Sequence, residues 1–173
     1  MLNANLKEKQ ITGNLSELYH TDYYTWAMAN AELLKEGKLD KIDYINLAEE
    51  VKDLGKSEYY RLESYLANLL SHLYKWDNQP ELRTKSWINT IANSINDIAL
   101  TLKRNPGLKY EQVFNDAFLD GWNKARYIIF SDTEIKFNLI PEDPPYSFKE
   151  AIRKASEITE IHNKDIFSLN NLF

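Results

Sequence analysis

Residues 57–76 read SEYYRLESYLANLLSHLYKW, and this stretch decides the fold class. Its apolar side chains recur every three or four residues, which is the period of a helix rather than the alternation of a strand: Leu62, Tyr65, Leu66, Leu69, Leu70, Leu73 and Trp76. The stripe is wider than a surface helix needs. We therefore predict a central helix that contacts neighbours on two sides, with Ser57 as its cap and Pro80 as its stop.

The same period is present upstream of this stretch. From Leu18 to Glu36 it predicts a first helix, and Gly37 stands where a left-handed residue would end it. Asp43 is a good N-cap for a second, short helix that Gly55 ends. The apolar residues of this short helix are Leu47, Val51 and Leu54. Ending it at Gly55 predicts an antiparallel hairpin with the central helix.

Three further segments follow the central helix. Residues 87–102 and 113–129 each have the helical period, and Gly121 in the second marks close helix packing. Three prolines preclude regular structure between Ser131 and Tyr146. Ser147 and Glu150 form a capping box, which predicts a sixth helix from Phe148 to about His162.

Together these elements predict an all-α fold, an antiparallel up-and-down helical bundle of four to five helices with a C-terminal appended helix and tail. We expect three parts. Residues 1–16 form a flexible N-terminal segment and residues 17–131 form the bundle. Residues 132–173 form a proline-bearing surface loop, a short helix and a tail, which pack on the bundle or extend from it.

Composition removes several classes of function. The 173 residues include no cysteine, which excludes disulfides, thiolate zinc sites and thiol nucleophiles. The N-terminus carries no apolar run long enough for a signal peptide, and no segment approaches the length of a membrane span, so we expect a cytoplasmic protein and no membrane partner. The net charge of −5 disfavours long-range attraction to nucleic acid.

A set of residues spread over these elements is recognisable as a family pattern. Its most specific part is the string His72-Leu73-Tyr74-Lys75-Trp76 with Gln79-Pro80 and Ser86-Trp87. Upstream it includes Leu18, Tyr19, Asp22, Trp26, Gly37, Asp43, Asn46, Glu49, Glu50, Gly55, Lys56 and Ser57. The chain resembles, over roughly residues 18–151, the bacterial family catalogued as domain-of-unknown-function family twenty-nine.

The resemblance implies a small helical domain and brings no known catalytic residue. The family-motif residues that it marks are Glu49, Glu50, His72, Lys75, Trp76, Gln79, Pro80 and Trp87. The chain departs from the pattern at Lys56, where members usually carry arginine, so a bidentate role at this position is not expected. The charged helix and tail after Ala151 have no match in the pattern.

A metal or acid/base site formed by Glu49, Glu50 and His72 has suitable ligand types. The predicted hairpin argues against it, because it leaves His72 roughly 15 Å along the helix from the position level with Glu49. We therefore predict no metal at these residues, and the sequence gives no indication of a cofactor. The simpler interpretation makes Glu49 and Glu50 surface charges, with Arg61 on the facing helix as ion-pair partner and Lys52 merely nearby in sequence.

His72 has two interpretations. It shares a helix face with Leu69 and Trp76, as a packed, hydrogen-bonded histidine would. The hairpin would also place it at the bundle end that holds a polar cluster of Asp40, Asp43 and Arg83, where it could bind an anion or shuttle a proton.

A third grouping combines basic and aromatic residues: Lys75, Arg83 and Lys85 with Trp76 and Trp87. Such a grouping can bind single-stranded nucleic acid. Tryptophans at helical spacing are more often core residues, and the net negative charge of the chain also disfavours binding of nucleic acid. The sequence therefore does not favour nucleic acid as a partner.

The leading functional hypothesis is a non-catalytic protein-interaction module. It would use the bundle ends or the C-terminal tail, whose apolar residues are Ile166, Phe167, Leu169, Leu172 and Phe173. The partner would be another protein or a second copy in a homodimer. The alternative is a small metal-dependent hydrolase or nuclease-like enzyme with its site around His72.

Overall fold

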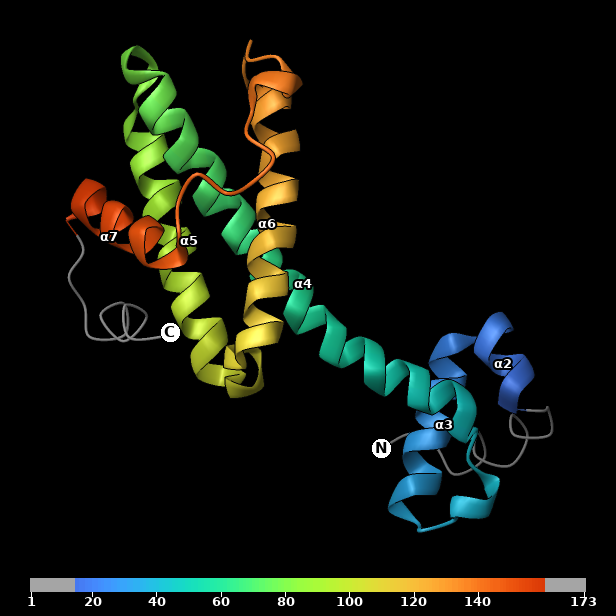
Figure 1. Cartoon of the computed structure of the whole chain (residues 1–173). Coiled ribbons are helices and arrows are strands. Elements are labelled where there is room, and N and C mark those ends of the chain that lie inside the picture. Colours follow the sequence, from blue (N-terminus) through green and yellow to red (C-terminus); the bar gives the residue numbers. More distant parts are fainter. Residues whose placement is uncertain (1–14, 161–173) are drawn as a thin grey trace. The chain divides into compact units, whose positions relative to one another are not determined.

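The computed structural model describes residues 15–160, and these contain α-helices, short 3-10 helices and no strand. The predicted all-α fold is therefore confirmed. The chain divides into two compact units, Met1–Gly55 and Lys56–Phe173, called unit 1 and unit 2 below (Figure 1). The bundle predicted over residues 17–131 spans this boundary.

Unit 1 contains α2 (Leu15–Thr21), α3 (Tyr23–Lys35), the 3-10 helix η1 (Leu39–Lys41) and the start of α4. The single helix predicted from Leu18 to Glu36 is wrong, because Asp22 leaves helical geometry and caps α3 with its side chain. Its Oδ1 accepts from the backbone N–H of Thr25 at 3.1 Å. Gly37 has φ 70°, so the predicted left-handed stop after α3 is confirmed.

The hairpin predicted at Gly55 is also wrong, because α4 runs without a break over Tyr44–Asn78. A glycine costs a helix about 1 kcal/mol but ends it only where the backbone turns left-handed, and Gly55 lacks the positive φ that Gly37 has. The next proline is Pro80, and α4 ends before it, as predicted. Despite its length α4 is too polar to cross a membrane, and no other helix within residues 15–160 could do so.

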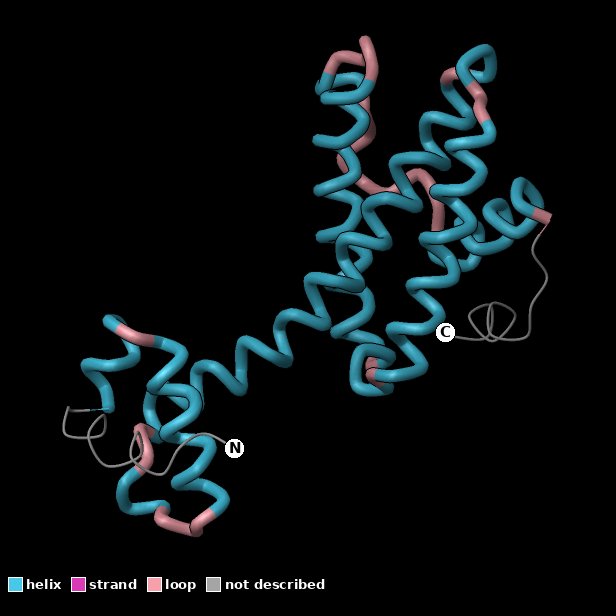
Figure 2. The backbone as a smooth tube through the Cα atoms, turned by 180° about the vertical axis from the view of Figure 1, so that it is seen from behind, coloured by secondary structure: helices cyan, strands magenta, loops and turns pink. Residues whose placement is uncertain are grey.

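Unit 2 is a helical bundle. The part of α4 after Gly55, α5 (Lys85–Arg104) and α6 (Glu111–Asp132) run up, down and up, joined by the 3-10 helices η2 (Pro80–Leu82) and η3 (Pro106–Lys109) (Figures 1 and 2). Helix α7 (Phe148–Thr159) packs against α5. The core comes from all four helices, and its fully buried side chains include Leu62, Leu66, Leu69, Leu70, Leu73, Ile91, Ile95, Ile98, Leu102, Phe114, Trp122, Ile129 and Ile152.

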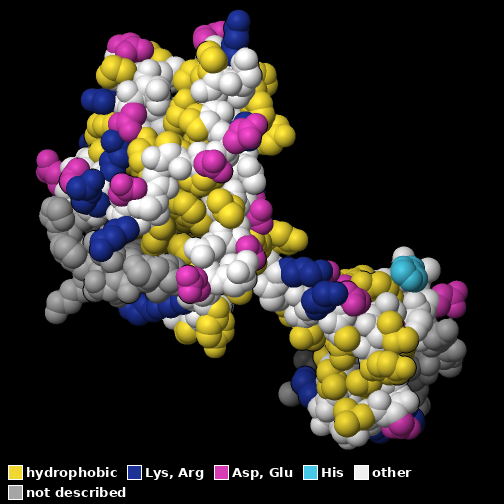
Figure 3. Space-filling view, viewed as in Figure 1, with side chains coloured by type: hydrophobic (Ala, Val, Ile, Leu, Met, Phe, Trp, Pro, Cys, Tyr) yellow, Lys and Arg dark blue, Asp and Glu magenta, His cyan; other side chains and the backbone are white. Residues whose placement is uncertain are grey.

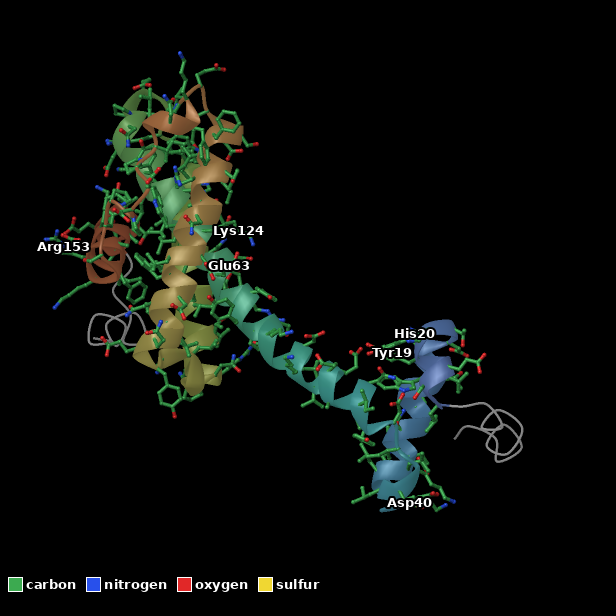
Figure 4. The ribbon with its side chains drawn as sticks, turned by 45° about the vertical axis from the view of Figure 1, so that its right-hand side comes forward. Tyr19, His20, Asp40, Glu63, Lys124 and Arg153 are labelled. Carbon is green, nitrogen blue, oxygen red and sulfur yellow. The ribbon has the colours of Figure 1, made fainter. Side chains whose placement is uncertain are left out.

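Helices α4 and α6 approach closely at Gly121, as the sequence predicts. A Cβ atom added there would lie 2.8 Å from the Cβ of Leu66 and 3.2 Å from the carbonyl oxygen of Glu63. One turn later Lys124 reaches across to the Glu63 carboxylate at 3.2 Å (Figure 4). The absence of a side chain at Gly121 therefore sets the spacing of the two helices.

The proline-bearing stretch after α6 contains the 3-10 helix η4 (Phe137–Leu139). The indole N–H of Trp122 donates to the carbonyl oxygens of Pro141 and Glu142 at 3.2 and 3.0 Å, which fixes this stretch on α6. The predicted capping box of Ser147 and Glu150 is present and begins α7. His162 and the apolar tail from Ile166 to Phe173 lie outside the described residues.

Candidate functional site

Three family-motif residues of unit 2 meet where the end of α4 faces the start of α5. The ammonium nitrogen of Lys75 lies 5.5 Å from the ring centroid of Trp87. The imidazole of His72 stands edge-on to the same indole, with the ring centroids 6.3 Å apart. With Asp132, at the end of α6, they form what we call the His72 cluster.

Lys75 is the most enclosed charge of this cluster. Its side chain is 5 % exposed, and its Nζ lies 2.9 Å from Oδ2 of Asp132, which is 46 % exposed. A buried ammonium needs a paired carboxylate, because its desolvation is otherwise uncompensated. The sequence analysis did not identify Asp132, since 57 residues separate it from Lys75 and nothing in the sequence links the two positions.

His72 is half-buried, and its Nδ1 lies 2.9 Å from the backbone carbonyl oxygen of Asn68. A carbonyl only accepts, so Nδ1 carries the proton of the neutral ring and Nε2 carries the lone pair. Burial, and then the positive charge of Lys75, lowers the pKa of His72. The ring is therefore neutral at pH 7, and it can accept a proton or hydrogen bond at Nε2.

Arg83 and Trp76 form a separate pair in unit 2. The guanidinium lies 4.7 Å from the ring centroid of Trp76, and its Nε donates to the Trp76 carbonyl oxygen at 2.9 Å. This contact closes the turn that contains Gln79 and Pro80. Since Trp76 and Trp87 each already have a cation of this chain over the ring, the arrangement does not favour stacking of nucleic-acid bases.

Asp43 forms a different cluster, in unit 1. Its Oδ2 accepts from the indole N–H of Trp26 at 3.1 Å and from the amide of Asn46 at 2.7 Å. The side chain of Asn30 accepts from the Asp43 backbone N–H at 2.8 Å. Burial acts to raise the pKa of Asp43, but the hydrogen bonds from Asn46 and Trp26 outweigh it and hold the pKa below its ordinary value. This carboxylate is a structural group that joins α3 to the start of α4.

The structure therefore places the predicted polar cluster in two different units. Asp40, on η1 (Figure 4), and Asp43 belong to unit 1, while His72 and Arg83 belong to unit 2. Their described hydrogen bonds and ring contacts go to residues of their own units. The hairpin that would have joined them does not form, because α4 is continuous.

Glu49 and Glu50 do not pair with Arg61. Glu49 pairs with Lys52 at 3.3 Å, and Arg61 pairs with Glu58 at 2.8 Å, so the predicted partner is wrong. The reason is again the continuous α4, which provides no facing helix at this point. Glu50 accepts hydrogen bonds from the hydroxyls of Tyr19 and Tyr23 at 2.8 and 2.7 Å, which links α2 and α3 to α4.

A further polar group joins the proline-bearing stretch to α4. The hydroxyl of Tyr146 lies 2.5 Å from Oδ2 of Asp77, and Lys154 on α7 lies 2.7 Å from Oδ1 of the same carboxylate. Burial and the Asp77 hydrogen bond raise the pKa of Tyr146. The sequence analysis did not identify this contact, because 69 residues separate Tyr146 from Asp77.

The ligand types around His72 do not form a metal centre. Within residues 15–160 no three His, Asp or Glu side chains lie close enough together to hold a metal ion. Near His72 the carboxylate is Asp132, which already binds Lys75.

Unit 1 differs from unit 2 in having more exposed than buried large apolar side chains among its described residues. Hydrophobic side chains gather on the face of unit 1 seen in Figure 3. Within residues 15–55 nine large apolar residues are exposed: Tyr23, Tyr24, Met28, Leu34, Leu39, Tyr44, Ile45, Val51 and Leu54. Val51 and Leu54 were predicted to pack as the apolar stripe of a short helix, but they are 60 and 70 % exposed and do not pack in the core.

Comparison with known proteins adds a family. A family model described as Domain of unknown function DUF29 matches residues 18–155, which is most of the chain. No curated protein matches the chain. No solved structure matches it either.

Proposed function

The chain belongs to the family described as Domain of unknown function DUF29, and from this premise we propose that it is a protein-interaction module whose binding surface lies on unit 1. The family description names no activity, so the proposal rests on geometry.

The observation that carries the proposal is the imbalance between exposed and buried apolar residues in unit 1. Among residues 15–55 nine large apolar side chains are exposed, against three buried apolar ones, Trp26, Ala29 and Leu33. Isolated exposed apolar residues are ordinary, but a gathered set indicates a surface that another molecule covers. A unit of this size also buries too little surface to be more than marginally stable alone, so a partner would stabilise it.

Photo-crosslinking of the full-length chain in cells tests this proposal. A benzophenone amino acid replaces Tyr24 or Tyr44 on unit 1, and Tyr110 on unit 2 is the control, because it is 72 % exposed. We expect one protein adduct of the same added mass from both unit 1 positions and none from Tyr110. Adducts that are absent, or equal at all three positions, would contradict the proposal. An added mass equal to the chain itself would identify self-association.

The alternative of a small metal-dependent hydrolase or nuclease-like enzyme around His72 gains no support from the site. Of the predicted carboxylates, Asp43 binds within unit 1. The His72 cluster brings only one carboxylate, which neutralises Lys75. We therefore propose the interaction role alone.

A further inference from the structure

Helix α3 has apolar side chains on opposite faces. Trp26, Ala29 and Leu33 are buried against the rest of unit 1. On the other side Tyr24 and Met28, one turn apart, are 67 and 46 % exposed. These two side chains lie on the face of α3 opposite its buried residues, and they share that face with Lys35, which is 75 % exposed.

The start of α4 carries a second exposed apolar stripe. Tyr44, Leu47, Val51 and Leu54 are spaced three and four residues apart; Leu47 is half-buried, and the other three are exposed. This is the spacing of a heptad seam, in which one helix lies along another. The shape of the surface therefore fits a helix better than a loop or a flat sheet.

The net charge of residues 15–55 indicates the charge of the partner helix. Residues 15–55 contain nine acidic side chains, Glu17, Asp22, Glu32, Glu36, Asp40, Asp43, Glu49, Glu50 and Asp53, and four basic ones, Lys35, Lys38, Lys41 and Lys52, which gives −9 + 4 = −5. The whole chain also carries −5, so residues 15–55 account for all of its net negative charge. A second copy would bring the same negative charge to the contact, whereas a basic partner would be attracted.

We propose that the exposed apolar stripe on the first turns of α4 binds a basic amphipathic helix of another protein. The proposal rests on the proposed interaction role and names the chemistry of the partner. The apolar side of that helix covers Tyr44, Val51 and Leu54, and its lysines or arginines face the acidic side chains of residues 15–55.

Peptide titration of the full-length chain tests the proposal. Three fluorescent peptides of equal length are compared: a leucine/lysine peptide with heptad spacing, its leucine/glutamate counterpart, and a leucine/lysine peptide with the leucines scattered. We expect the first to bind at least about tenfold more tightly than the other two, and to weaken as salt is added. Equal binding of the basic and acidic heptad peptides would overturn the inference.

Variants locate the binding face. Val51→Asp should weaken binding of the basic heptad peptide about tenfold or more, because it puts a charge in the apolar seam. Tyr110→Asp, on exposed unit 2 surface, is the matched control and should leave the affinity unchanged. Unchanged affinity in Val51→Asp, with circular dichroism showing an intact fold, would overturn the proposed face.

The two proposals can fail separately. Crosslinks at Tyr24 and Tyr44 without binding of the basic peptide would leave the interaction role standing and overturn only the partner chemistry. Sedimentation that shows a dimer of the full chain, dissolved by Val51→Asp, would assign the surface to a second copy. If removal of residues 1–14 is required before any peptide binds, the surface belongs to that segment, and the basic partner is overturned as well.

Discussion

The indole N–H of Trp26 donates to Oδ2 of Asp43 at 3.1 Å, so the small core of unit 1 is organised around a carboxylate. The same side chain caps α4, since its Oδ1 lies 3.4 Å from the backbone N–H of Asn46. Unit 1 therefore depends on one residue both for a helix start and for a buried hydrogen bond.

Replacing Asp43 by alanine should destabilise unit 1 by about 2–4 kcal/mol, because it removes the cap and leaves the buried indole N–H without an acceptor. Asp43→Asn should cost less, since an amide oxygen still accepts. Urea unfolding followed by the indole resonance of Trp26, the one tryptophan in residues 1–55, gives the measurement. Asp40→Asn on exposed η1 is the control, and an equal effect of the two asparagine substitutions would contradict the assigned role.

The pKa of Asp43 adds a pH dependence with a definite sign. Its folded pKa lies below the ordinary value, so the stability it provides is complete above the unfolded pKa of about 3.9. That stability is lost as the pH falls through the folded value. The Trp26 resonance should therefore report loss of unit 1 below about pH 4, and Asp43→Asn should flatten this dependence.

Two glycines give opposite predictions for the same substitution. Gly121→Ala should destabilise unit 2 by about 1–3 kcal/mol, because the new Cβ would lie 2.8 Å from Leu66 Cβ. Gly55→Ala should stabilise α4 by about 0.5–1 kcal/mol, since no atom lies within 4 Å of the added Cβ and alanine favours a helix. Denaturation of both variants checks this. A destabilising Gly55→Ala would mean that the chain turns at Gly55, as the sequence had suggested.

The helical period predicted the class of fold and most helix positions. It succeeded where the signal is local: the stop at Pro80, the capping box of Ser147, the left-handed Gly37 and the small residue at Gly121. It failed at Gly55, because a glycine is compatible with both a break and a continuous helix. A break at Gly55 would have packed residues 43–54 against the helix that follows, whereas a continuous α4 does not bring them together.

The same ambiguity explains why the site could be predicted only in part. His72 and Lys75 lie three residues apart on one helix, so their proximity follows from the sequence. Their partners Trp87 and Asp132 come from other helices, and pairing across such separations depends on packing that one sequence does not specify. The prediction that Val51 and Leu54 pack against the central helix was wrong for a related reason. Apolar residues at helical spacing indicate a face suited to packing, but they do not specify which element packs on it.

In the ion pair of Lys75 with Asp132 the ammonium is buried and the carboxylate is half-exposed, so the two substitutions should differ in cost. Asp132→Asn should destabilise unit 2 by about 1–3 kcal/mol, because the enclosed ammonium loses its counter-charge while the exposed carboxylate is partly screened. Lys75→Met should cost less, since it removes the buried charge and keeps the volume. A double-mutant cycle measures the coupling, which should make the double variant less unstable than the sum of the single ones.

Lys75→Met has a second readout in His72. The charge of Lys75 helps to hold the pKa of His72 down, so its removal should raise that pKa in an NMR titration. Lys124→Met, which removes a half-exposed lysine paired with Glu63, is the control and should leave the His72 titration where it was. An unchanged His72 pKa in Lys75→Met would show that burial alone sets it.

Tyr146 should make unit 2 sensitive to alkali. Its hydroxyl donates to Asp77 at 2.5 Å, and burial with this bond raises its folded pKa, so the stability it provides is complete below about pH 10 and is lost as the pH rises through the raised value. Tyr146→Phe should cost about 1 kcal/mol at neutral pH. The difference in the free energy of unfolding between wild type and Tyr146→Phe should then close above about pH 10, because the unfolded wild-type chain is stabilised by ionising Tyr146 and the variant cannot be.

Urea unfolding of both proteins at several pH values gives this difference, with Tyr110→Phe as the exposed control. Some alkaline dependence should remain in Tyr146→Phe, because the hydroxyl of Tyr59 donates to Asp120 at 2.6 Å and its pKa is raised as well. If the unfolding free energies of wild type and Tyr146→Phe instead differ by the same amount from pH 7 to 11, Asp77 does not keep the Tyr146 proton in place.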